Sequence, residues 1–475
     1  MPGKTLRSAP VMLALNIVAF VMLFLASPAS GGEGFGFPNA PEDPALRVSC
    51  DLSGSWECAR FDDPNMDRDP LEPVRALPAD FDGMTWAEIA VPGDAFAVRP
   101  EMDGCHRFFY RTRVRVPVAY AGRGAFLHFS GTNYIVSVFV NRTFIGSHRG
   151  VLVPWDMDIS CALKAGRENE LVIAVKSPWY AADPKPKDRD DPEGIHAKRN
   201  LKPTYQDSFY FVDTIFPSTK GEGDGLAVGL VNPVRLVSCG ELYVSDVHIM
   251  TSVSEKTLTA VVTVHNPSER ERTVELAAEA VHDASGAVEK RLAPMSVRVP
   301  ARGERSVRLE EKWEAPRLWW PSESVDDMPD CYQLRTTVSE AGAALDRHET
   351  LFGFREVSID GVDILLNGVP WHFYNWVDVD WSNPPVEERT PEEWLRRRFR
   401  QGDSYHRIAH DHDRLFGCRE EALEWLDRHG IAGRLSTCID GMFITHDLEN
   451  PLVWENFRRH VRQVVTAYRN HPSVM

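Results

Sequence analysis

Apolar and polar residues alternate in short runs through the first half of the chain. The runs are residues 108–116, 124–129, 134–140 and 170–175, each bounded by Gly, Pro, Asn or Asp. A period of two residues is typical of β-strands with one buried face. Short antiparallel strands at this spacing predict a jelly roll or sandwich over residues 45–238. Within it, the charged, proline-rich stretch 183–192 has no period and predicts an exposed loop.

A second all-β region follows over residues 241–352. Alternating runs occupy residues 258–266, 272–279 and 305–309, and no helical period interrupts them. About 110 residues of short strands predict an immunoglobulin-like β-sandwich.

Helical periods begin only after about residue 356. The helical runs are residues 391–401, 419–429 and 451–468, and the apolar stretches that precede them are 371–377, 405–409 and 431–435. Thr390 is a suitable N-cap for the first helix, and Gly430 ends the second. Strand alternating with helix predicts βα units. Three units fit into residues 356–475, so we expect the N-terminal part of a (β/α)8 TIM barrel, which takes about 250 residues in full.

The N-terminus has the pattern of a secretory signal peptide. Lys4 and Arg7 precede an apolar core at residues 11–26, and small residues suited to cleavage follow at 27–30. We therefore expect residues 1–30 to be removed and the protein to be secreted or periplasmic. The alternative is an uncleaved membrane anchor, for which the apolar run is short.

Composition narrows the class of partner. The chain has 475 residues, 43% of them hydrophobic, and a formal net charge of −16. The length predicts about three domains. The negative charge argues against nucleic acid and against anionic membrane surfaces, which require basic patches. A neutral or polar ligand fits this surface, and no membrane contact is expected after signal cleavage.

The eight cysteines lack the spacing of a metal site. In a chain of this size we expect most to be buried thiols. Cys50 and Cys58 are the pair whose disulfide is worth testing first, because an exported chain permits one. Asn141 begins an Asn-Arg-Thr sequence that matches a glycosylation sequon.

Motifs in all three regions resemble those of glycoside hydrolase family 2. They are VFVNRTFIGSHRG at 138–150, VPWDMDIS at 153–160, GRENELVIAV at 166–175, GLVNPVRL at 229–236, LWWP at 318–321, CYQL at 331–334, FGFR at 352–355 and LLNGVP at 365–370. The family includes β-galactosidases, β-glucuronidases and β-mannosidases. The resemblance implies a multidomain β plus α/β protein: a jelly-roll, galactose-binding-like domain, an immunoglobulin-like sandwich and a TIM barrel that is incomplete in this chain.

The resemblance also implies a mechanism. The family hydrolyses glycosides with retention, using two carboxyl groups about 5–5.5 Å apart, and needs no cofactor. Residues 469–474 resemble the lead-in to the fourth barrel strand, after which the family places its acid/base Glu. We therefore expect the sequence to be truncated within the catalytic barrel, and assign no catalytic residue to it.

Three departures from the family pattern leave the substrate open. Arg142 stands where the family usually has Gly in a hairpin. Residues 372–378 differ from the usual sequence after the first barrel strand. Arg407 and His410 keep the spacing of the second strand's motif, but its Tyr-Pro is lost.

Barrel enzymes carry their functional groups at the carboxyl ends of the strands. The candidates for substrate binding are therefore Asn375, Trp376, Arg407, His410 and Asp440, with Thr437 beside the last. An Arg can hold a carboxylate ionised, and a Trp offers an apolar face to a sugar ring. The alternatives are a structural ion pair for Arg407 and a core position for Trp376.

Other polar clusters are weaker candidates. His406, His410 and His412 lie close in sequence, but a strand places only two of them on one face, so no metal is expected. The acidic and aromatic residues at 376–381 predict a loop at the rim of the pocket. Asp207, Asp213 and the loop 221–225 could reach the barrel mouth, although a solvated turn explains them as well.

The resulting hypothesis is a retaining, exo-acting β-glycosidase that acts on oligo- or polysaccharides, of which this sequence is a fragment lacking the catalytic carboxylates. A non-catalytic carbohydrate-binding protein and a pseudoenzyme are the alternatives. In each case the partner is a carbohydrate rather than nucleic acid.

Overall fold

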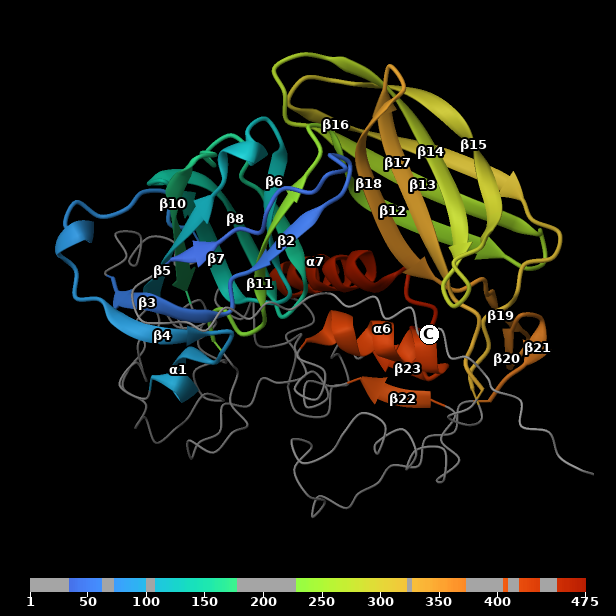
Figure 1. Ribbon diagram of the computed structural model, residues 1–475. Helices are drawn as coiled ribbons and strands as arrows, with labels where there is room; N and C mark the ends of the chain where they lie inside the picture. The colour runs from blue at the N-terminus through green and yellow to red at the C-terminus, as the bar shows by residue number, and fades with distance from the viewer. Residues whose placement is uncertain are drawn as a thin grey trace, which may run out of the picture. The chain divides into compact units, whose positions relative to one another are not determined.

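The structure is a computed structural model (Figure 1). It describes residues 34–61, 72–99, 107–176, 228–322, 327–372, 405–408, 418–435 and 451–475. Most of these residues lie in β-strands, as the sequence predicts.

The first sandwich has two sheets. One has seven strands, β1 (Phe35–Gly36), β3 (Gly54–Arg60), β4 (Ala87–Val91), β5 (Arg107–Val116), β7 (Asn133–Val140), β8 (Thr143–Val151) and β10 (Arg167–Lys176). They follow the order β4-β3-β5-β10-β7-β8, with β1 parallel to β5. The other sheet has the order β2-β11-β6-β9, from strands β2 (Val48–Asp51), β6 (Gly124–Phe129), β9 (Trp155–Asp158) and β11 (Val234–Cys239). Short helical segments are η1 (Phe81–Gly83), α1 (Ala95–Val98) and η3 (Val118–Tyr120).

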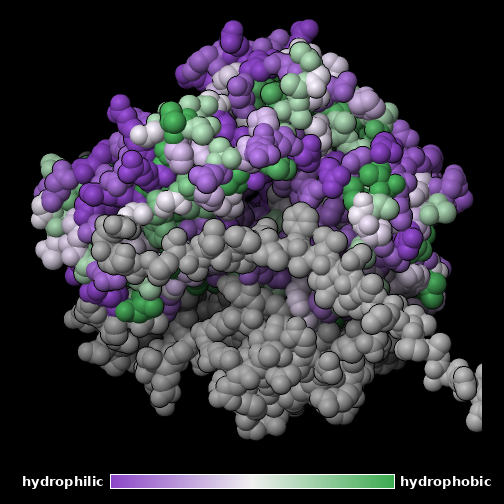
Figure 2. All heavy atoms as spheres, in the orientation of Figure 1, coloured by the Kyte–Doolittle hydropathy of each residue, from purple (hydrophilic) through white to green (hydrophobic). Residues whose placement is uncertain are grey.

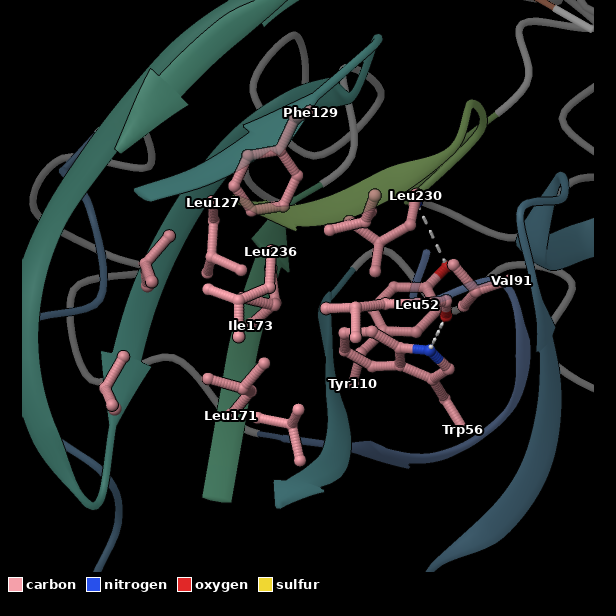
Figure 3. Packing of buried hydrophobic residues seen from close by; sticks show 14 of the residues in the cluster. Leu52, Trp56, Val91, Tyr110, Leu127, Phe129, Leu171, Ile173, Leu230 and Leu236 are labelled. Atoms are coloured by element: carbon pink, nitrogen blue, oxygen red, sulfur yellow. Dashed lines mark hydrogen bonds between the residues drawn. The ribbon is translucent and has the colours of Figure 1, made fainter. Parts of the chain in front are cut away.

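Apolar side chains from both sheets meet in one core (Figure 3). Leu127 and Leu236 of the smaller sheet pack in the same cluster as Ile173 and Tyr110 of the larger. Most buried polar atoms of folded proteins are hydrogen-bonded, and the indole nitrogen that enters this core follows that rule. The Trp56 Nε1 donates to the Leu52 carbonyl at 2.8 Å.

The cysteines of this sandwich correct one expectation. Cys50 and Cys58 are both buried thiols and are not joined in a disulfide. Cys50 lies on β2 and Cys58 on β3, which belong to opposite sheets, and both contribute to the apolar core. Cys239, Cys331 and Cys418 are also free and buried, as expected for thiols in a large chain.

The second sandwich is built from seven strands. A three-stranded sheet has the order β12-β13-β16, and a four-stranded sheet has the order β15-β14-β17-β18. The strands are β12 (Tyr243–Ser252), β13 (Thr257–Asn266), β14 (Arg272–His282), β15 (Val288–Val299), β16 (Gly303–Lys312), β17 (Tyr332–Glu340) and β18 (Ala343–Phe352). Val262 and Leu309 of one sheet share a buried cluster with Leu276 and Leu334 of the other. A small antiparallel sheet follows, with β19 (Val357–Asp360), β20 (Asp363–Leu366) and β21 (Val369–Pro370).

The remaining elements form an α/β segment. They are β22 (Tyr405–Ile408), α6 (Arg419–His429), β23 (Ala432–Leu435) and α7 (Pro451–Tyr468). The helices predicted at 419–429 and 451–468 are confirmed. The helix predicted at 391–401 lies outside the described residues. Helix α6 ends at Gly430, whose φ of 66° is the left-handed conformation that favours glycine.

The described residues on one face of the molecule are mainly polar (Figure 2). Figure 2 shows hydrophilic residues spread over the sandwiches, with apolar residues in small patches. Among the described residues, no helix is long and apolar enough to cross a membrane.

Candidate functional site

The candidate site lies at the carboxyl ends of two parallel strands. Strands β22 and β23 pair in parallel, with Tyr405 opposite Ala432 and Ile408 opposite Leu435. Helix α6 lies between them in the chain, so the three elements form a β-α-β unit. Because parallel strands end at the same edge, Ile408 and Leu435 mark the edge at which such units bind ligands.

The register of these strands brings two arginines to paired positions. Arg407 of β22 lies opposite Arg434 of β23, so the two positions share one face of the sheet. The next residue, Leu435, occupies the other face and packs against the cluster that contains Leu423 and Leu426 of α6.

The other residues predicted for the site belong to parts of the chain that the structure does not describe. Asn375, Trp376, His410 and Asp440 lie outside the described residues, and so do Thr437, Asp207 and Asp213. Of His406, only the backbone within β22 is described. Elsewhere in the described part of the chain, no group of three or more His, Cys, Asp or Glu side chains could hold a metal ion.

The last residues of the chain extend the parallel arrangement. Val474 forms an isolated parallel bridge with Gly433 of β23. The Gly433 amide donates to the Ser473 carbonyl at 2.6 Å, and the Met475 amide donates to the Gly433 carbonyl at 3.0 Å. A third chain segment thus lies alongside β23 in the direction of β22 and β23.

A buried carboxylate of α6 fixes this third segment. Asp427 is fully buried. Its Oδ2 lies 2.6 Å from the His471 Nδ1, and its Oδ1 accepts the Ser473 amide at 2.9 Å. Burial alone would lower the pKa of His471, but the Asp427 carboxylate outweighs this effect and raises it. The imidazolium form of His471 is therefore favoured beside Asp427.

Asp, His and Ser also form the catalytic triads of some hydrolases, but the geometry of Asp427, His471 and Ser473 excludes that chemistry. In a triad the Ser hydroxyl donates to the His. Here Ser473 meets Asp427 through its backbone amide, and its hydroxyl is buried with no hydrogen-bond partner. A fully buried hydroxyl cannot meet a substrate, so this cluster is structural.

The second sandwich holds the same cluster from the other side. The Trp319 Nε1 donates to the Asp427 carbonyl at 2.9 Å, and the Cys331 thiol lies 3.4 Å from that oxygen. Arg355 donates to the Val474 carbonyl. Burial lowers the pKa of Arg355 to about 10, although the charge of Asp427 opposes this shift. Trp319, Cys331 and Arg355 belong to the LWWP, CYQL and FGFR motifs, respectively. These motifs therefore help to hold the third segment in place.

Asn470 and Arg469 complete the attachment. The Asn470 side chain accepts the Ile249 amide at 2.9 Å and donates to the Val247 carbonyl at 2.6 Å, both on β12. Arg469 pairs with Asp246 of the same strand, at 2.6 Å to its Oδ1. The residues that lead into the third segment are thus bound to the second sandwich through side chains.

The hairpin motif of the first sandwich is also structural. Asn141 donates from Nδ2 to the Ala162 carbonyl at 2.9 Å and to the Asn169 Oδ1 at 2.8 Å. A glycan would attach to this same nitrogen, but in the folded protein the nitrogen is engaged in these two internal hydrogen bonds. Arg142 has a φ of 70°, which explains why glycine is usual at this turn position. The Arg142 side chain is held by Asp82 at 2.7 Å and by Glu170 at 2.6 Å.

Comparison with known proteins identifies the family. Residues 242–355 match the model of glycosyl hydrolases family 2, and residues 101–209 match the glycosyl hydrolase 2 galactose-binding domain-like model. Two regions of the chain therefore carry domains of glycoside hydrolase family 2. Both matches fall in the regions whose motifs suggested this family, although residues 101–106 and 177–209 of the second lie outside the described part.

Individual relatives are distant. A β-glucuronidase of Paenibacillus borealis is 23% identical over 92% of this chain and 68% of its own length. A β-galactosidase of Thermoanaerobacter pseudethanolicus is 23% identical over 83% of this chain and 48% of its own. The structure of a Bacteroides uniformis β-glucuronidase superposes with a TM-score of 0.62 at 19% identity, covering 90% of this chain and 46% of the other. The chain thus spans about half to two thirds of the length of these relatives.

Proposed function

We propose that this chain forms part of a retaining, exo-acting β-glycosidase acting on oligo- or polysaccharides. Its second sandwich is then the immunoglobulin-like domain of the family, and β22, α6, β23 and α7 belong to its TIM barrel. The observation that carries the proposal is the parallel pairing of β22 with β23, in a chain of this family, with a third parallel segment at Val474. No residue of this chain is assigned as an acid/base or nucleophile.

The proposed substrate-binding residues are those at the carboxyl ends of the barrel strands. Arg407 and His410 follow or end β22, Asp440 follows β23, and Asn375 with Trp376 would follow the first barrel strand. In this arrangement an arginine orients a carboxylate through paired hydrogen bonds, and Trp376 lines the sugar ring.

The arginine pair favours an acidic sugar. Like charges at neighbouring positions on one face of a sheet repel each other, and an anion bound between them relieves that repulsion. Arg407 and Arg434 occupy such positions. A uronic acid supplies a carboxylate, whereas a galactose does not. We therefore propose a β-glucuronide-like substrate in preference to a β-galactoside, in line with the names of two of the relatives above.

An assay on aryl β-glycosides tests the proposal. The chain, and any longer product of the same gene, would be incubated with aryl β-glucuronide, β-galactoside and β-mannoside, and the anomeric product followed by NMR. We expect the longer product to release the β-anomer first, and to prefer the glucuronide. Release of the α-anomer first would contradict the retaining mechanism. Binding of the sugars without turnover would favour the carbohydrate-binding or pseudoenzyme alternatives.

Two substitutions separate the roles of the arginines. Arg407→Ala should lower turnover about 100-fold, because positioned charges of this kind are worth about 10²–10³ in rate. Arg434→Gln should reduce the preference for glucuronide over galactoside while leaving galactoside turnover unchanged. Equal losses of turnover on the glucuronide and the galactoside would show that Arg434 does not bind the carboxylate of the substrate.

We further propose that residues 1–30 direct export and are cleaved. The support is the Lys4 and Arg7 region followed by the apolar core. N-terminal sequencing of the exported protein would decide, since an intact Met1 or Pro2 contradicts cleavage.

A further inference from the structure

Strand β9 of the first sandwich carries two aspartates that each meet a histidine. Asp156 Oδ1 lies 2.7 Å from the His128 Nδ1, and Asp158 Oδ2 lies 2.9 Å from the His265 Nε2. The first histidine is on β6, the neighbouring strand of the same sheet, and the second is on β13 of the second sandwich.

Each histidine also contacts a second carboxylate through its other ring nitrogen. The His128 Nε2 lies 3.0 Å from the Glu420 Oε2 of α6. The His265 Nδ1 lies 3.2 Å from the Glu304 Oε1 of β16. In both cases one carboxylate belongs to the histidine's own sheet, because His128 opposes Asp156 and His265 opposes Glu304. The other carboxylate lies across a junction between parts of the chain.

A histidine between two carboxylates is best stabilised when both ring nitrogens carry protons. A neutral imidazole has one donor nitrogen, so one carboxylate would face a lone pair. Burial alone would lower the pKa of His128, but Glu420 and Asp156 outweigh it and raise the value to about 10. The pKa of His265 is likewise raised, despite burial, by Asp158 and Glu304.

The other groups around these histidines do not replace their charge. The Ser130 hydroxyl lies 3.3 Å from the His128 Nε2, and Arg235 of β11 pairs with Glu421 of α6 at 2.6 Å. Around His265, the Tyr243 hydroxyl of β12 donates to the Asp158 Oδ2 at 2.8 Å. Arg47, the other cation that acts on Asp156, is paired with Asp346 at 2.7 Å.

We propose that β9 is an alkali-sensitive junction, in which protonated His128 and His265 attach the first sandwich to α6 and to the second sandwich. Loss of either proton weakens the contact across the corresponding junction. This inference depends on the geometry of the two histidines and not on the proposed enzymatic activity.

The pH range follows from the direction of the shifts. The folded pKa of His128 lies above the unfolded value of about 6.5. Its contribution to stability is therefore fully present below about pH 6.5 and is lost as the pH rises through about 10. On the acid side, His128 lowers the pKa of Glu420 although burial raises it. The contribution of this carboxylate is lost as the pH falls below its usual titration range.

The primary test is a histidine titration of the full chain labelled with ¹³C at the imidazole Cε1. We expect the His128 signal, assigned by its absence in His128→Gln, to titrate near pH 10. In Glu420→Gln, the midpoint should fall by roughly 1–3 pH units, the usual effect of a nearby opposite charge. A midpoint near 6.5 in the wild-type chain would overturn the proposal, and so would an unchanged midpoint in Glu420→Gln.

Thermal melting provides a second test with a matched control. Glu420→Gln should lower the melting temperature at pH 7 by about 2–4 °C, and this deficit should disappear by about pH 11. Glu57→Gln removes a carboxylate from the same sandwich, but its partner at 2.8 Å is Arg111. Because arginine stays protonated at pH 11, the deficit of the control should persist. A Glu420→Gln deficit that is constant up to pH 11 would contradict an alkali-sensitive junction.

Discussion

The first sandwich and the α/β segment differ in how much apolar surface they bury. The first sandwich has a large apolar core between its sheets. The described part of the α/β segment has a cluster of only six buried apolar side chains, and one of these, Val153, comes from the first sandwich. The α/β segment is instead attached through buried and half-buried polar groups, among them Asp427, Glu420 and Asn470. Apolar burial is insensitive to pH and to moderate salt, but ion pairs and charge-assisted hydrogen bonds respond to both. The sandwiches should therefore remain folded under conditions that detach the segment carrying the candidate site.

The largest effect is expected in the core of the first sandwich. Trp56→Ala removes a side chain that is 2% exposed and should lower the free energy of unfolding of that sandwich by about 4 kcal/mol. Trp320→Ala, at a residue that is 38% exposed, is the control and should have a much smaller effect. Urea unfolding measures both. Equal losses of unfolding free energy in the two variants would show that the apolar core is not the main source of stability in the first sandwich.

Asp427→Ala tests the polar attachment. The substitution leaves the half-buried His471 and the buried Ser473 amide without their acceptor, which should cost about 3 kcal/mol. Hydrogen exchange should rise in α6 and in residues 470–475 but not in the first sandwich. Asp283 pairs with Arg428 of the same helix and its side chain is 25% exposed, so Asp283→Ala should cost less than about 1 kcal/mol. Faster exchange throughout the chain would contradict a local attachment.

Gly240→Ala tests the contact between the two sandwiches. A Cβ at this position would lie inside van der Waals distance of the Leu345 carbonyl oxygen. Because backbone atoms cannot yield as a side chain can, the cost should be about 2 kcal/mol. Gly36→Ala meets no atom within 4 Å and is the control. Comparable melting temperatures for the two variants would show that the junction is loosely packed.

The smallest effect is expected for exposed ion pairs of the second sandwich. Arg298 and Glu271 lie 3.5 Å apart with side chains that are 73% and 56% exposed. Arg298→Ala should change stability by less than about 0.5 kcal/mol, since exposed pairs are screened. A loss above 1 kcal/mol would mean that surface ion pairs also stabilise the sandwiches. The sandwiches would then differ less from the α/β segment in their dependence on polar interactions.

The sequence predicts the strands well because alternation records burial directly. The alternating run 108–116 corresponds to β5 at Arg107–Val116, and the run 124–129 to β6 at Gly124–Phe129. Helix α6 is equally clear, since its amphipathic run ends at a glycine in the left-handed conformation. These signals are local, so a single sequence contains them in full.

The polar attachments have no such local signal. His128 and Glu420 are 292 residues apart in the chain, and nothing near either residue indicates the other. The candidate site likewise has no local sequence signal, because its residues come from the ends of successive strands that are far apart in the sequence. For Arg407 the pattern predicts a strand, which is confirmed, while its role in substrate binding stays a prediction. The departure at Arg142 becomes understandable only with its φ value and its ion pairs.

The described cysteines are thiols and not disulfides, so a thiol-specific reagent can report on the regions that carry them. Cys161 is exposed and should react with a maleimide at once, whereas five other described thiols are buried. Burial raises the pKa of Cys50 in the first sandwich and of Cys418 at the start of α6 to about 12, so both react only when their surroundings open. Mass spectrometry after timed labelling would therefore record how often each region opens, and the native chain already carries the reporters that this measurement needs.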